Sequence, residues 1–449
     1  MTHPSTAGSM FKHLDGHDYV IVGGGTAGCV LANRLSENPE VRVLLLEAGA
    51  EDWNPLVHMP AGIAQLVGQK GVNWDYNTAP DPNLKQRSLW WPRGKVVGGS
   101  SSINAMCYIR GHARDYDEWE ALGCEGWNWN NVLPYFRKSE GNVRGSDAFH
   151  GADGPLTVSD PRHLNALTPV FLEAANQAGF EATEDFNGAR QKGFGLYQTT
   201  TREGSRCSSA VAYLRPARKR PNLKIITKAT ASRIVFEDGR ASAVVYAVAG
   251  KGGFCEAASR EVILCGGSIN SPQLLMLSGI GDAQTLQDMG IQVQVNAPEV
   301  GKNLQDHFMV RFAYRTKPCG TLNEIMANPI RAAGLGLEWA LRRKGQMAVG
   351  ASEASLFARV LPGSEEPEVQ FQFVNFSLGG NQGTSANSLA KHPGFTFNFC
   401  VCRPDSRGDL TLRSPNVADK PVIRANYLTA PSDIRIMLES AKLGRRIAA

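Results

Sequence analysis

The sequence predicts an α/β fold with two kinds of sheet, and three observations support this prediction. Residues 19–22 form a short apolar run that leads through a glycine-rich turn into a helical pattern, as expected for a buried parallel strand followed by a helix. A second apolar run, 41–46, has the length of another buried strand. Beyond His307, apolar and polar residues alternate in runs such as 369–373 and 395–401. This alternation is typical of an antiparallel sheet with one covered face.

The composition is that of an ordinary globular protein. The chain has 449 residues, enough for two or three domains, of which 42% are hydrophobic and 20% charged. Its formal net charge of +5 is small, and the basic runs 215–220 and 342–344 read as solvated surface, so no nucleic-acid partner is expected. The nine cysteines follow no disulfide or zinc spacing, which predicts reduced thiols in a cytoplasmic protein. Neither a signal peptide nor a transmembrane segment is predicted, and peripheral membrane association stays open.

The turn after the first strand has the glycine spacing of a dinucleotide-binding loop. Gly23, Gly25 and Gly28 match G-x-G-x-x-G between a strand and a helix. The first glycine allows a tight turn, the second allows a pyrophosphate to approach the backbone, and the third allows the helix to pack on the strand. Glu47 ends the second strand, where its carboxylate can accept hydrogen bonds from ribose hydroxyls. These residues predict dinucleotide binding, but they do not separate NAD from FAD.

Residues 94–111, with the sequence GKVVGGSSSINAMCYIRG, form a backbone that carries few large side chains. A flexible linker has a similar composition, but here apolar residues flank the small ones on both sides, as in a buried segment. Gly98 and Gly99 would let the chain approach a ligand without Cβ atoms. Residues 100–102 and Asn104 would offer short hydrogen-bonding groups. We therefore expect this segment to lie against the cofactor.

Two long patterns resemble the signatures of the glucose–methanol–choline (GMC) flavoprotein oxidoreductases. The first is the segment 94–111, and the second runs from Gly267 to Gly281 with the sequence GSINSPQLLMLSGIG. Further stretches, including DYDEWEALG (115–123) and PEVGKNLQDH (298–307), are similar to the choline dehydrogenase branch. The resemblance extends from about Asp18 to the chain end. It implies a Rossmann-like FAD-binding domain and a substrate-binding (cap) domain with a mainly antiparallel sheet.

The resemblance also implies which residues contact the flavin. In the family, the first signature lies along the flavin, and the residue matching Ala231 places its backbone against the adenine. Ile103 stands where some members carry a histidine that bonds covalently to the flavin, so the FAD is expected to be noncovalent. The predicted FAD-binding residues are Gly23, Gly25, Thr26, Ala27, Gly28, Glu47, Ala48, Val97, Gly98, Gly99, Ser100, Ser102, Asn104, Ala105, Met106 and Ala231.

The two domains are expected to alternate along the chain. We predict that the FAD-binding domain comprises residues 1–160 and 201–310, and that the substrate-binding domain comprises 161–200 and 311–449. Alternating Phe371, Phe373, Phe397 and Phe399 either line an apolar pocket or pack within the sheet, and packing is the more common role. The remaining expected elements are strands at 222–227, 233–236 and 261–265, a helix beginning at 271–272 and a helix over 331–343.

The resemblance also implies an activity, the oxidation of a primary alcohol to an aldehyde. A histidine would act as the base, and a hydride would pass to flavin N5. The family's active-site segment, resembling H-x-x-G-T-x-x-M-G, does not occur in this sequence. The chain is therefore expected to be truncated before that segment, to hold no catalytic residue and to show little turnover. Three hypotheses stay open: a choline dehydrogenase-like enzyme, an alcohol oxidase that forms hydrogen peroxide, and a silent fragment that binds only nucleotide or a partner. The electron acceptor, whether oxygen, a quinone or another molecule, is not indicated.

Two isolated residues complete the candidates. His307 is expected to be a buried, hydrogen-bonded structural histidine, since the family does not assign catalysis there. Glu353 is the one carboxylate in the cap that we name for recognising a quaternary ammonium substrate, with surface charge as the alternative. The other histidines form no ligand pair, and no metal site is predicted.

Overall fold

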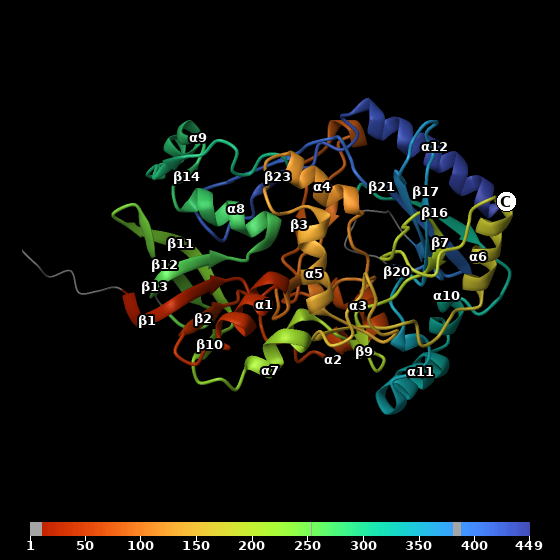
Figure 1. Ribbon diagram of the computed structural model, residues 1–449, viewed down its shortest axis with the longest axis horizontal. Coiled ribbons are helices and arrows are strands. Elements are labelled where there is room, and N and C mark those ends of the chain that lie inside the picture. Colours follow the sequence, from red (N-terminus) through yellow and green to blue (C-terminus); the bar gives the residue numbers. More distant parts are fainter. Residues whose placement is uncertain (1–10, 253, 380–387) are drawn as a thin grey trace, which may run out of the picture.

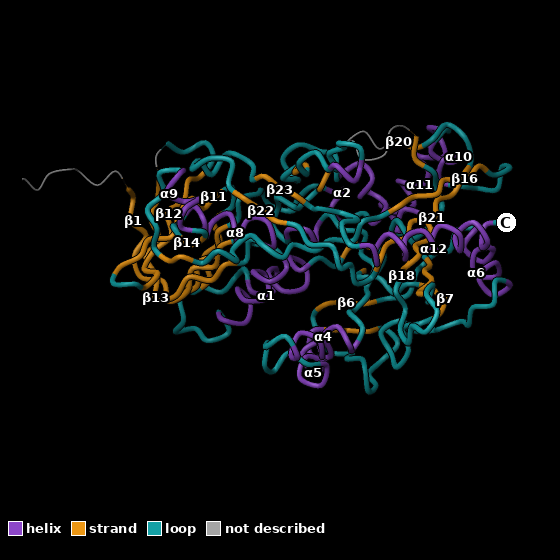
Figure 2. The backbone as a smooth tube through the Cα atoms, turned by 90° about the horizontal axis from the view of Figure 1, so that it is seen from above, coloured by secondary structure: helices purple, strands orange, loops and turns teal. Residues whose placement is uncertain are grey.

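Two sheets lie at opposite ends of an elongated molecule, with short helices and long irregular segments between them (Figures 1 and 2). The computed structural model describes residues 11–252, 254–379 and 388–449. No helix in these ranges has the length and apolar character needed to cross a lipid bilayer.

The first sheet has six strands in the order β10-β2-β1-β13-β12-β11. The first four are parallel, and β11 and β12 form an antiparallel hairpin that extends the sheet beyond β13. The strands are β1 (Phe11–Val22), β2 (Val43–Leu46), β10 (Leu223–Ile226), β11 (Ala229–Glu237), β12 (Arg240–Val248) and β13 (Phe254–Leu264). The predicted strands at 19–22, 222–227, 233–236 and 261–265 all occur, but β1, β11 and β13 begin eight, four and seven residues earlier than predicted, and the strand predicted at 41–46 begins only at Val43.

Both faces of this sheet are covered, which explains why β2 and the end of β1 are continuous apolar runs. Ile21 packs on one side with Cys29 and Ala32 of the helix α1 (Thr26–Leu35). Val20 and Leu44 pack on the other side against the hairpin and the helix α8 (Gly267–Leu277). Adjacent residues point to opposite faces because the side chains of a strand alternate.

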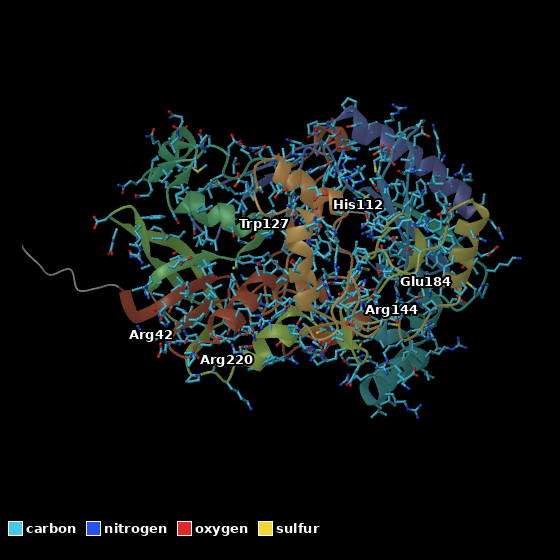
Figure 3. The ribbon with its side chains drawn as sticks, in the orientation of Figure 1. Arg42, His112, Trp127, Arg144, Glu184 and Arg220 are labelled. Atoms are coloured by element: carbon cyan, nitrogen blue, oxygen red, sulfur yellow. The ribbon has the colours of Figure 1, made fainter. Side chains whose placement is uncertain are left out.

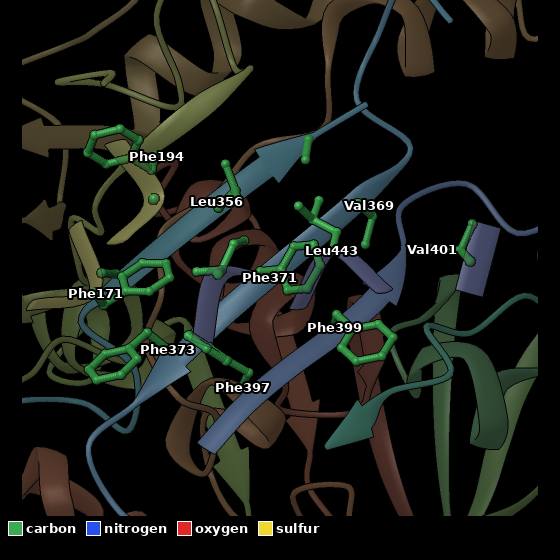
Figure 4. Close-up of a cluster of buried hydrophobic side chains, with 14 of the residues drawn as sticks. Phe171, Phe194, Leu356, Val369, Phe371, Phe373, Phe397, Phe399, Val401 and Leu443 are labelled. Carbon is green, nitrogen blue, oxygen red and sulfur yellow. The ribbon is translucent and has the colours of Figure 1, made fainter. Parts of the chain in front are cut away.

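The second sheet has five antiparallel strands in the order β16-β21-β18-β17-β7. Its aromatic face is covered by helices α6 (Leu167–Gln177) and α12 (Pro431–Ala448), whose Phe171 and Leu443 join the same cluster (Figure 4). Phe371 lies opposite Phe399 and Phe373 opposite Phe397, and all four are at most 3% exposed. These phenylalanines therefore pack within the sheet and do not line a pocket. The strands are β7 (Gly193–Leu196), β16 (Val310–Arg315), β17 (Ala354–Ala358), β18 (Val369–Val374) and β21 (Gly394–Val401).

The other elements are short and join or cover the two sheets. A hairpin of β22 (Asp409–Thr411) and β23 (Val422–Arg424) packs against α8, so this late part of the chain lies beside the first sheet. The other helices are α2 (Pro55–His58), α3 (Ile63–Leu66), α4 (Ala113–Ala121), α5 (Trp129–Ser139), α7 (Arg215–Ala217), α9 (Ala283–Asp288), α10 (Leu322–Met326) and α11 (Pro329–Arg342). The other paired strands are β3 (Tyr76–Asn77) with β4 (Trp90–Trp91), β5 (Glu140–Asn142) with β6 (Leu156–Val158), β8 (Thr201–Arg202) with β9 (Ser205–Arg206), β14 (Ile280–Gly281) with β15 (Val295–Asn296), and β19 (Leu378–Gly379) with β20 (Ser388–Leu389).

One predicted helix start is wrong and another is nearly right. The helix expected to begin at 271–272 begins at Gly267, so Pro272 lies inside α8. Proline lacks an N–H, and the carbonyl of Ser268 therefore receives no helical hydrogen bond from Pro272. The helix expected over 331–343 is α11, whose Pro329 occupies the first turn, where proline is well tolerated.

Candidate functional site

A cavity of about 520 Å³ lies at the carboxyl ends of β1, β2 and β13. Its walls include the last residues of these strands, Val22, Leu46 and Leu264. In open sheets with parallel strands, this edge is where ligands bind, because loops and helix N-termini converge there. The cavity therefore occupies the position that the glycine pattern predicts for a dinucleotide.

The glycine turn between β1 and α1 forms one wall of the cavity. Gly23 has φ of +107°, and a Cβ there would come within 2.5 Å of the carbonyl oxygen of Cys265. A Cβ on Gly28 would come within 1.9 Å of the carbonyl oxygen of Gly23. A Cβ on Gly25, by contrast, would meet no protein atom closer than 3.9 Å, although Gly25 lines the cavity. The protein itself requires the first and third glycines, whereas space for a ligand is what explains the second.

The N-terminus of α1 is open towards this cavity. Gly25 is the N-cap residue and offers no side chain, so the first N–H groups of the helix receive no side-chain cap. Thr26 and Ala27, the first two residues of α1, line the cavity. Free N–H groups and the positive end of the helix dipole make this a site for an anionic group such as a diphosphate.

A second helix N-terminus faces the same cavity. Gly267 and Ser268, at the start of α8, line it together with the N-cap residue Gly266. This N-cap also forms no side-chain hydrogen bond. The two helices begin after β1 and β13, which are neighbours in the sheet, so their positive ends converge on one ligand.

Glu47 occupies the end of β2 and is only 5% exposed. Its carboxylate accepts hydrogen bonds from the N–H of Gly24 and from the N–H of Gly49, each at 2.7 Å. Burial raises the pKa of this carboxyl group to about 7, although the two N–H groups favour the ionised form. Glu47 lines the cavity, and a carboxylate oxygen that accepts one hydrogen bond can accept another from a ribose hydroxyl.

Residues 94–106, which we call the ribbon, lie directly against the glycine turn. The N–H of Gly98 donates to the carbonyl of Gly24 at 2.8 Å. Gly99 has φ of +53°, and a Cβ on it would come within 2.7 Å of the Cα of Gly25. A Cβ on Gly94 would meet the carbonyl oxygen of Gly99 at 2.2 Å. A side chain is therefore excluded at Gly99 by the contact with the turn, and at Gly94 by the ribbon's own backbone.

The buried side chain of Arg206 fixes the ribbon from behind. It is 1% exposed and donates to the carbonyl oxygens of Val57 (2.7 Å), Ser101 (3.1 Å) and Asn104 (2.8 Å). Burial lowers the pKa of Arg206 to about 10. Ser101 and Ser209 share a second contact, with their hydroxyl oxygens 2.8 Å apart. The conformation of the ribbon is thus set by hydrogen bonds from the segment 206–209.

The predicted binding residues fall into two groups. The ribbon leaves the cavity after Ser100 and ends near the second sheet, where the carbonyl of Met106 accepts the N–H of Thr200 at 2.9 Å. The residues that line the cavity are Gly23, Gly25, Thr26, Ala27, Glu47, Ala48, Gly99, Ser100 and Ala231. Those that do not line it are Gly28, Val97, Gly98, Ser102, Asn104, Ala105 and Met106.

Most residues of the second group lie within the protein and support the ribbon there, whereas Asn104 is exposed. Val97 and Met106 are each 1% exposed, and Met106 has φ of +64°, which is unusual for a residue with a side chain. Ser102 is fully buried and donates to the carbonyl of Val97 at 2.8 Å. The side-chain oxygen of Asn104 accepts from Arg206 at 2.8 Å. These side chains set the shape of the ribbon.

The sequence reasoning missed several residues of the cavity wall. Gly266, Gly267 and Ser268 belong to the strand–glycine–helix pattern at 261–281, which repeats the logic of the first turn and could have been used to find them. Trp74 and Arg93 also line the cavity, but neither lies in a pattern that points to a ligand. Arg206 carried no signal, because a single arginine in a loop resembles any surface cation.

The two isolated candidates are both corrected by the structure. His307 is hydrogen bonded as expected, with Nε2 2.9 Å from the carbonyl oxygen of Cys402, but it is exposed and not buried. Glu353 is only 3% exposed, so it is not a surface charge. Its carboxylate accepts the backbone N–H of Asn165 at 2.9 Å, the Asn165 amide and the hydroxyl of Thr168 at 2.5 Å. These bonds tie it to the start of α6.

A second buried polar cluster lies between the two sheets and outside the cavity. Arg110 donates to Glu140 at 2.7 Å, and both side chains are almost completely buried. His150 lies between Glu140 (3.0 Å) and Asp185 (2.7 Å), and hydrogen bonds to these carboxylates raise its pKa to about 9. Nearby, Arg144 donates to the carbonyl of Glu184 at 2.8 Å. Figure 3 labels both residues. The cluster joins β5 to the loop before β7.

Comparisons with known proteins agree with this geometry. The family model described as GMC oxidoreductase matches residues 17–309. The chain is 45% identical over 436 residues to the alcohol dehydrogenase [acceptor] of Pseudomonas putida, covering 96% of this chain and 78% of that protein. It is 44% identical over 457 residues to the mitochondrial choline dehydrogenase of Homo sapiens, covering 99% of this chain and 75% of that protein. The chain thus spans about three quarters of the length of these relatives.

The fold comparison gives the same family. The chain superposes on the formate oxidase of Aspergillus oryzae RIB40 with a TM-score of 0.88 at 27% identity. That structure concerns the effect of a mutation on FAD modification. The match covers 97% of this chain and 81% of that one. The family model covers both the glycine turn and the ribbon, which are the two parts that meet at the cavity. This chain belongs to the GMC oxidoreductase family of FAD-dependent flavoproteins.

Proposed function

We propose that this protein is an FAD-dependent dehydrogenase that oxidises the CH–OH group of a small alcohol to a carbonyl group. The observation that carries this proposal is the contact between the ribbon and the glycine turn, at an open cavity where two helix N-termini meet. The names of the relatives support the substrate class, because they include an alcohol dehydrogenase and a choline dehydrogenase at 44–45% identity.

The residues of the cavity fit FAD. The free N–H groups at Gly25 and Thr26 and at the start of α8 would hold the diphosphate. Glu47 would accept the ribose hydroxyls, as a carboxylate at this position does in dinucleotide folds. The backbone of residues 229–231 would lie beside the adenine, and Gly99 and Ser100 would lead from the diphosphate towards the flavin ring. Gly25 is the strongest sign of fit, since no protein atom occupies the space that a side chain there would fill.

When bound, FAD supplies the redox chemistry by accepting a hydride equivalent from the alcohol carbon. The chain's own contribution is to bind and orient. The ribbon is held at one end by the glycine turn and at its centre by Arg206, so the backbone beside the cofactor is fixed before the cofactor arrives. Such preorganisation reduces the entropy lost when reacting groups are brought together.

We propose that the FAD is noncovalent. Ile103 has no nitrogen, oxygen or sulfur side-chain atom, and it is 5% exposed in a cluster with Val57 and Val96. It therefore supplies no atom for a covalent bond to the flavin. When the protein is precipitated with acid, we expect the yellow colour to appear in the supernatant. Colour that stays with the precipitated polypeptide would contradict this expectation.

The domain boundaries are part of the same proposal. The strands of the first sheet all lie within 1–160 or 201–310, which we assign to FAD binding. The strands of the second sheet lie within 161–200 or from residue 310 onwards, which we assign to the substrate-binding domain. The hairpin β22–β23 is an addition to the first group, because it packs on α8.

Anaerobic reduction of the flavin tests the proposed function. Protein expressed from its complete gene is loaded with FAD, mixed without oxygen with choline, aliphatic alcohols or benzylic alcohols, and followed at the flavin absorbance band. We expect at least one of these alcohols to bleach the flavin and to yield the matching aldehyde. Protein that binds FAD but is bleached by dithionite and by none of the alcohols would refute the proposed activity.

The same preparation distinguishes the electron acceptors. If reduced enzyme is reoxidised rapidly by a quinone or a dye and slowly by air, the protein is a dehydrogenase, as we propose. Rapid reoxidation by oxygen with stoichiometric hydrogen peroxide would instead make it an oxidase.

A further inference from the structure

The helix α11 presents an apolar face to solvent. Three large side chains on it are strongly exposed: Ile330 (84%), Leu337 (60%) and Leu341 (74%). Smaller exposed residues, Ala333, Gly334 and Ala340, have the spacing that places them on the same side of a helix. We call these six residues the α11 stripe.

A surface helix normally exposes polar side chains on the face away from the core, whereas α11 exposes apolar ones there. Trp339 lies on the opposite side of the helix, is 5% exposed and donates from Nε1 to the carbonyl of Gly204 at 2.8 Å. This side attaches α11 to the rest of the protein through the cluster that includes Met347. The helix α11 therefore buries one apolar side and exposes a second, and an exposed apolar patch of this kind marks an interaction site.

The helix is well formed without a partner. The side chain of Asn328 caps its N-terminus by accepting from the N–H groups of Ile330 (3.0 Å) and Arg331 (3.2 Å). Pro329 fits the first turn, and Arg343 ends the helix in a left-handed conformation. A ligand for the stripe would therefore meet a rigid surface and need not induce folding.

Basic side chains accompany the stripe. Within 328–345 the charged residues are Arg331, Arg342, Arg343 and Lys344, against the single acidic Glu338. Arg343 stacks over the ring of Trp339 at 4.0 Å. In the part of the chain that the structure describes, Arg331, Arg342 and Lys344 form no recorded ion pair, and all three are exposed. Their positive charge is therefore available to an anionic partner.

We propose that α11 docks this protein onto an anionic lipid surface. An amphipathic helix with apolar side chains on one face and basic residues beside it lies in the plane of the membrane interface, with its apolar face among the acyl chains and its cations at the headgroups. The stripe would enter the lipid, and Arg331, Arg342 and Lys344 would contact the headgroup phosphates. Figure 1 shows α11 at the lower edge of the molecule, beyond the body of the second sheet, where a flat surface can reach it.

A second copy of the chain fits this face less well. Pairing two α11 stripes about a twofold axis would bring two groups of basic residues together, and like charges at close distance oppose association. Anionic lipid instead neutralises those residues while it buries the stripe.

Vesicle binding tests the proposal. The FAD-loaded protein is mixed with vesicles of phosphatidylcholine, either alone or with phosphatidylglycerol, and the bound fraction is measured by co-sedimentation. We expect binding to the anionic vesicles that weakens with added salt, and little binding to the neutral ones. The double variant L337Q/L341Q should lose at least about tenfold in affinity, because two large apolar side chains no longer leave water. R342Q/K344Q should reduce the dependence on anionic lipid.

The matched control is L122Q/V295Q, which replaces two exposed apolar residues far from α11. All variants alter exposed side chains, and unchanged circular dichroism and FAD affinity will show that they are folded. Wild-type protein that does not bind anionic vesicles would overturn the proposal, as would binding that L337Q/L341Q leaves unchanged. If the stripe variants instead convert a dimer to a monomer in sedimentation velocity without any vesicle binding, the surface is a contact between copies and the lipid proposal is wrong.

Discussion

Alanine substitutions at Gly25 and at Gly28 should differ in their effect on stability, although the two glycines lie in one turn. A Cβ on Gly28 would sit 1.9 Å from the carbonyl oxygen of Gly23, where contact distances require well over 3 Å. The clashing atoms lie at the end of β1 and in the first turn of α1, so the clash is removed only if the helix moves away from the sheet. Overpacking of this kind costs about 3 kcal/mol. G28A should therefore lower the free energy of unfolding and weaken FAD binding through loss of structure.

G25A should leave the fold intact and weaken FAD binding. Gly25 has φ of −77°, which alanine adopts freely, and its Cβ would meet no protein atom within 3.9 Å. The unfolding free energy should change by less than about 1 kcal/mol, in either direction. The methyl group would extend into the cavity beside the N-terminus of α1, where the diphosphate is expected, and FAD affinity should fall about 10- to 100-fold, from a steric cost of about 1–3 kcal/mol.

The assay pairs two measurements on each variant. Urea denaturation of the FAD-free protein gives stability, and titration with FAD, followed by quenching of flavin fluorescence, gives affinity. The reasoning predicts that G25A loses affinity without losing stability and that G28A loses both. Wild-type FAD affinity in a stable G25A variant would refute the placement of the diphosphate, whatever the result for G28A.

Two further predictions concern the groups that hold the structure around the cavity. R206K keeps the buried charge but cannot donate to Val57 and Asn104 together, so FAD affinity should fall about tenfold and the free energy of unfolding by about 2 kcal/mol. The control is R218K, which alters an exposed ion pair with Glu51. Equal effects of the two variants would show that Arg206 does not fix the ribbon. The pKa of His150 is raised from 6.5 to about 9 by Asp185 and Glu140, so its contribution to stability is full below pH 6.5 and is lost as the pH rises through 9. H150Q should therefore cost about 2–3 kcal/mol at pH 6 and much less above pH 9 in urea denaturation, and a cost that is independent of pH would contradict the assigned ion pairs.

Much of the fold was predictable because its central strands follow simple patterns. The end of β1, residues 20–22, is buried in a parallel sheet with both faces covered, so it appears in the sequence as an apolar run that ends at a glycine. Strand β18 alternates in burial along its length, as a sheet with one covered face requires. The helix α8 was misplaced because Pro272 suggested a first turn, whereas the glycines at 266–267 begin the helix.

The site was predictable where backbone conformation dictates the residue type. Gly23 and Gly99 both have positive φ values and close backbone neighbours, and such positions leave a clear trace in the sequence. Residues that act through distant contacts leave no such trace. Arg206 contacts residues about one hundred positions away, and Glu353 is bound by Asn165 and Thr168 from a separate segment. Their burial depends on tertiary packing, which residue type alone does not reveal.

The central claim is that the ribbon and the glycine turn together hold FAD. A crystal structure of this chain grown with FAD tests it most directly. The account predicts the diphosphate at the N-terminus of α1, beside Gly25 and Thr26, with Gly99 and Ser100 in van der Waals contact with the cofactor and the ribose hydroxyls bonded to Glu47. FAD found elsewhere on the chain, or bound in the cavity with the ribbon displaced from the turn, would contradict it.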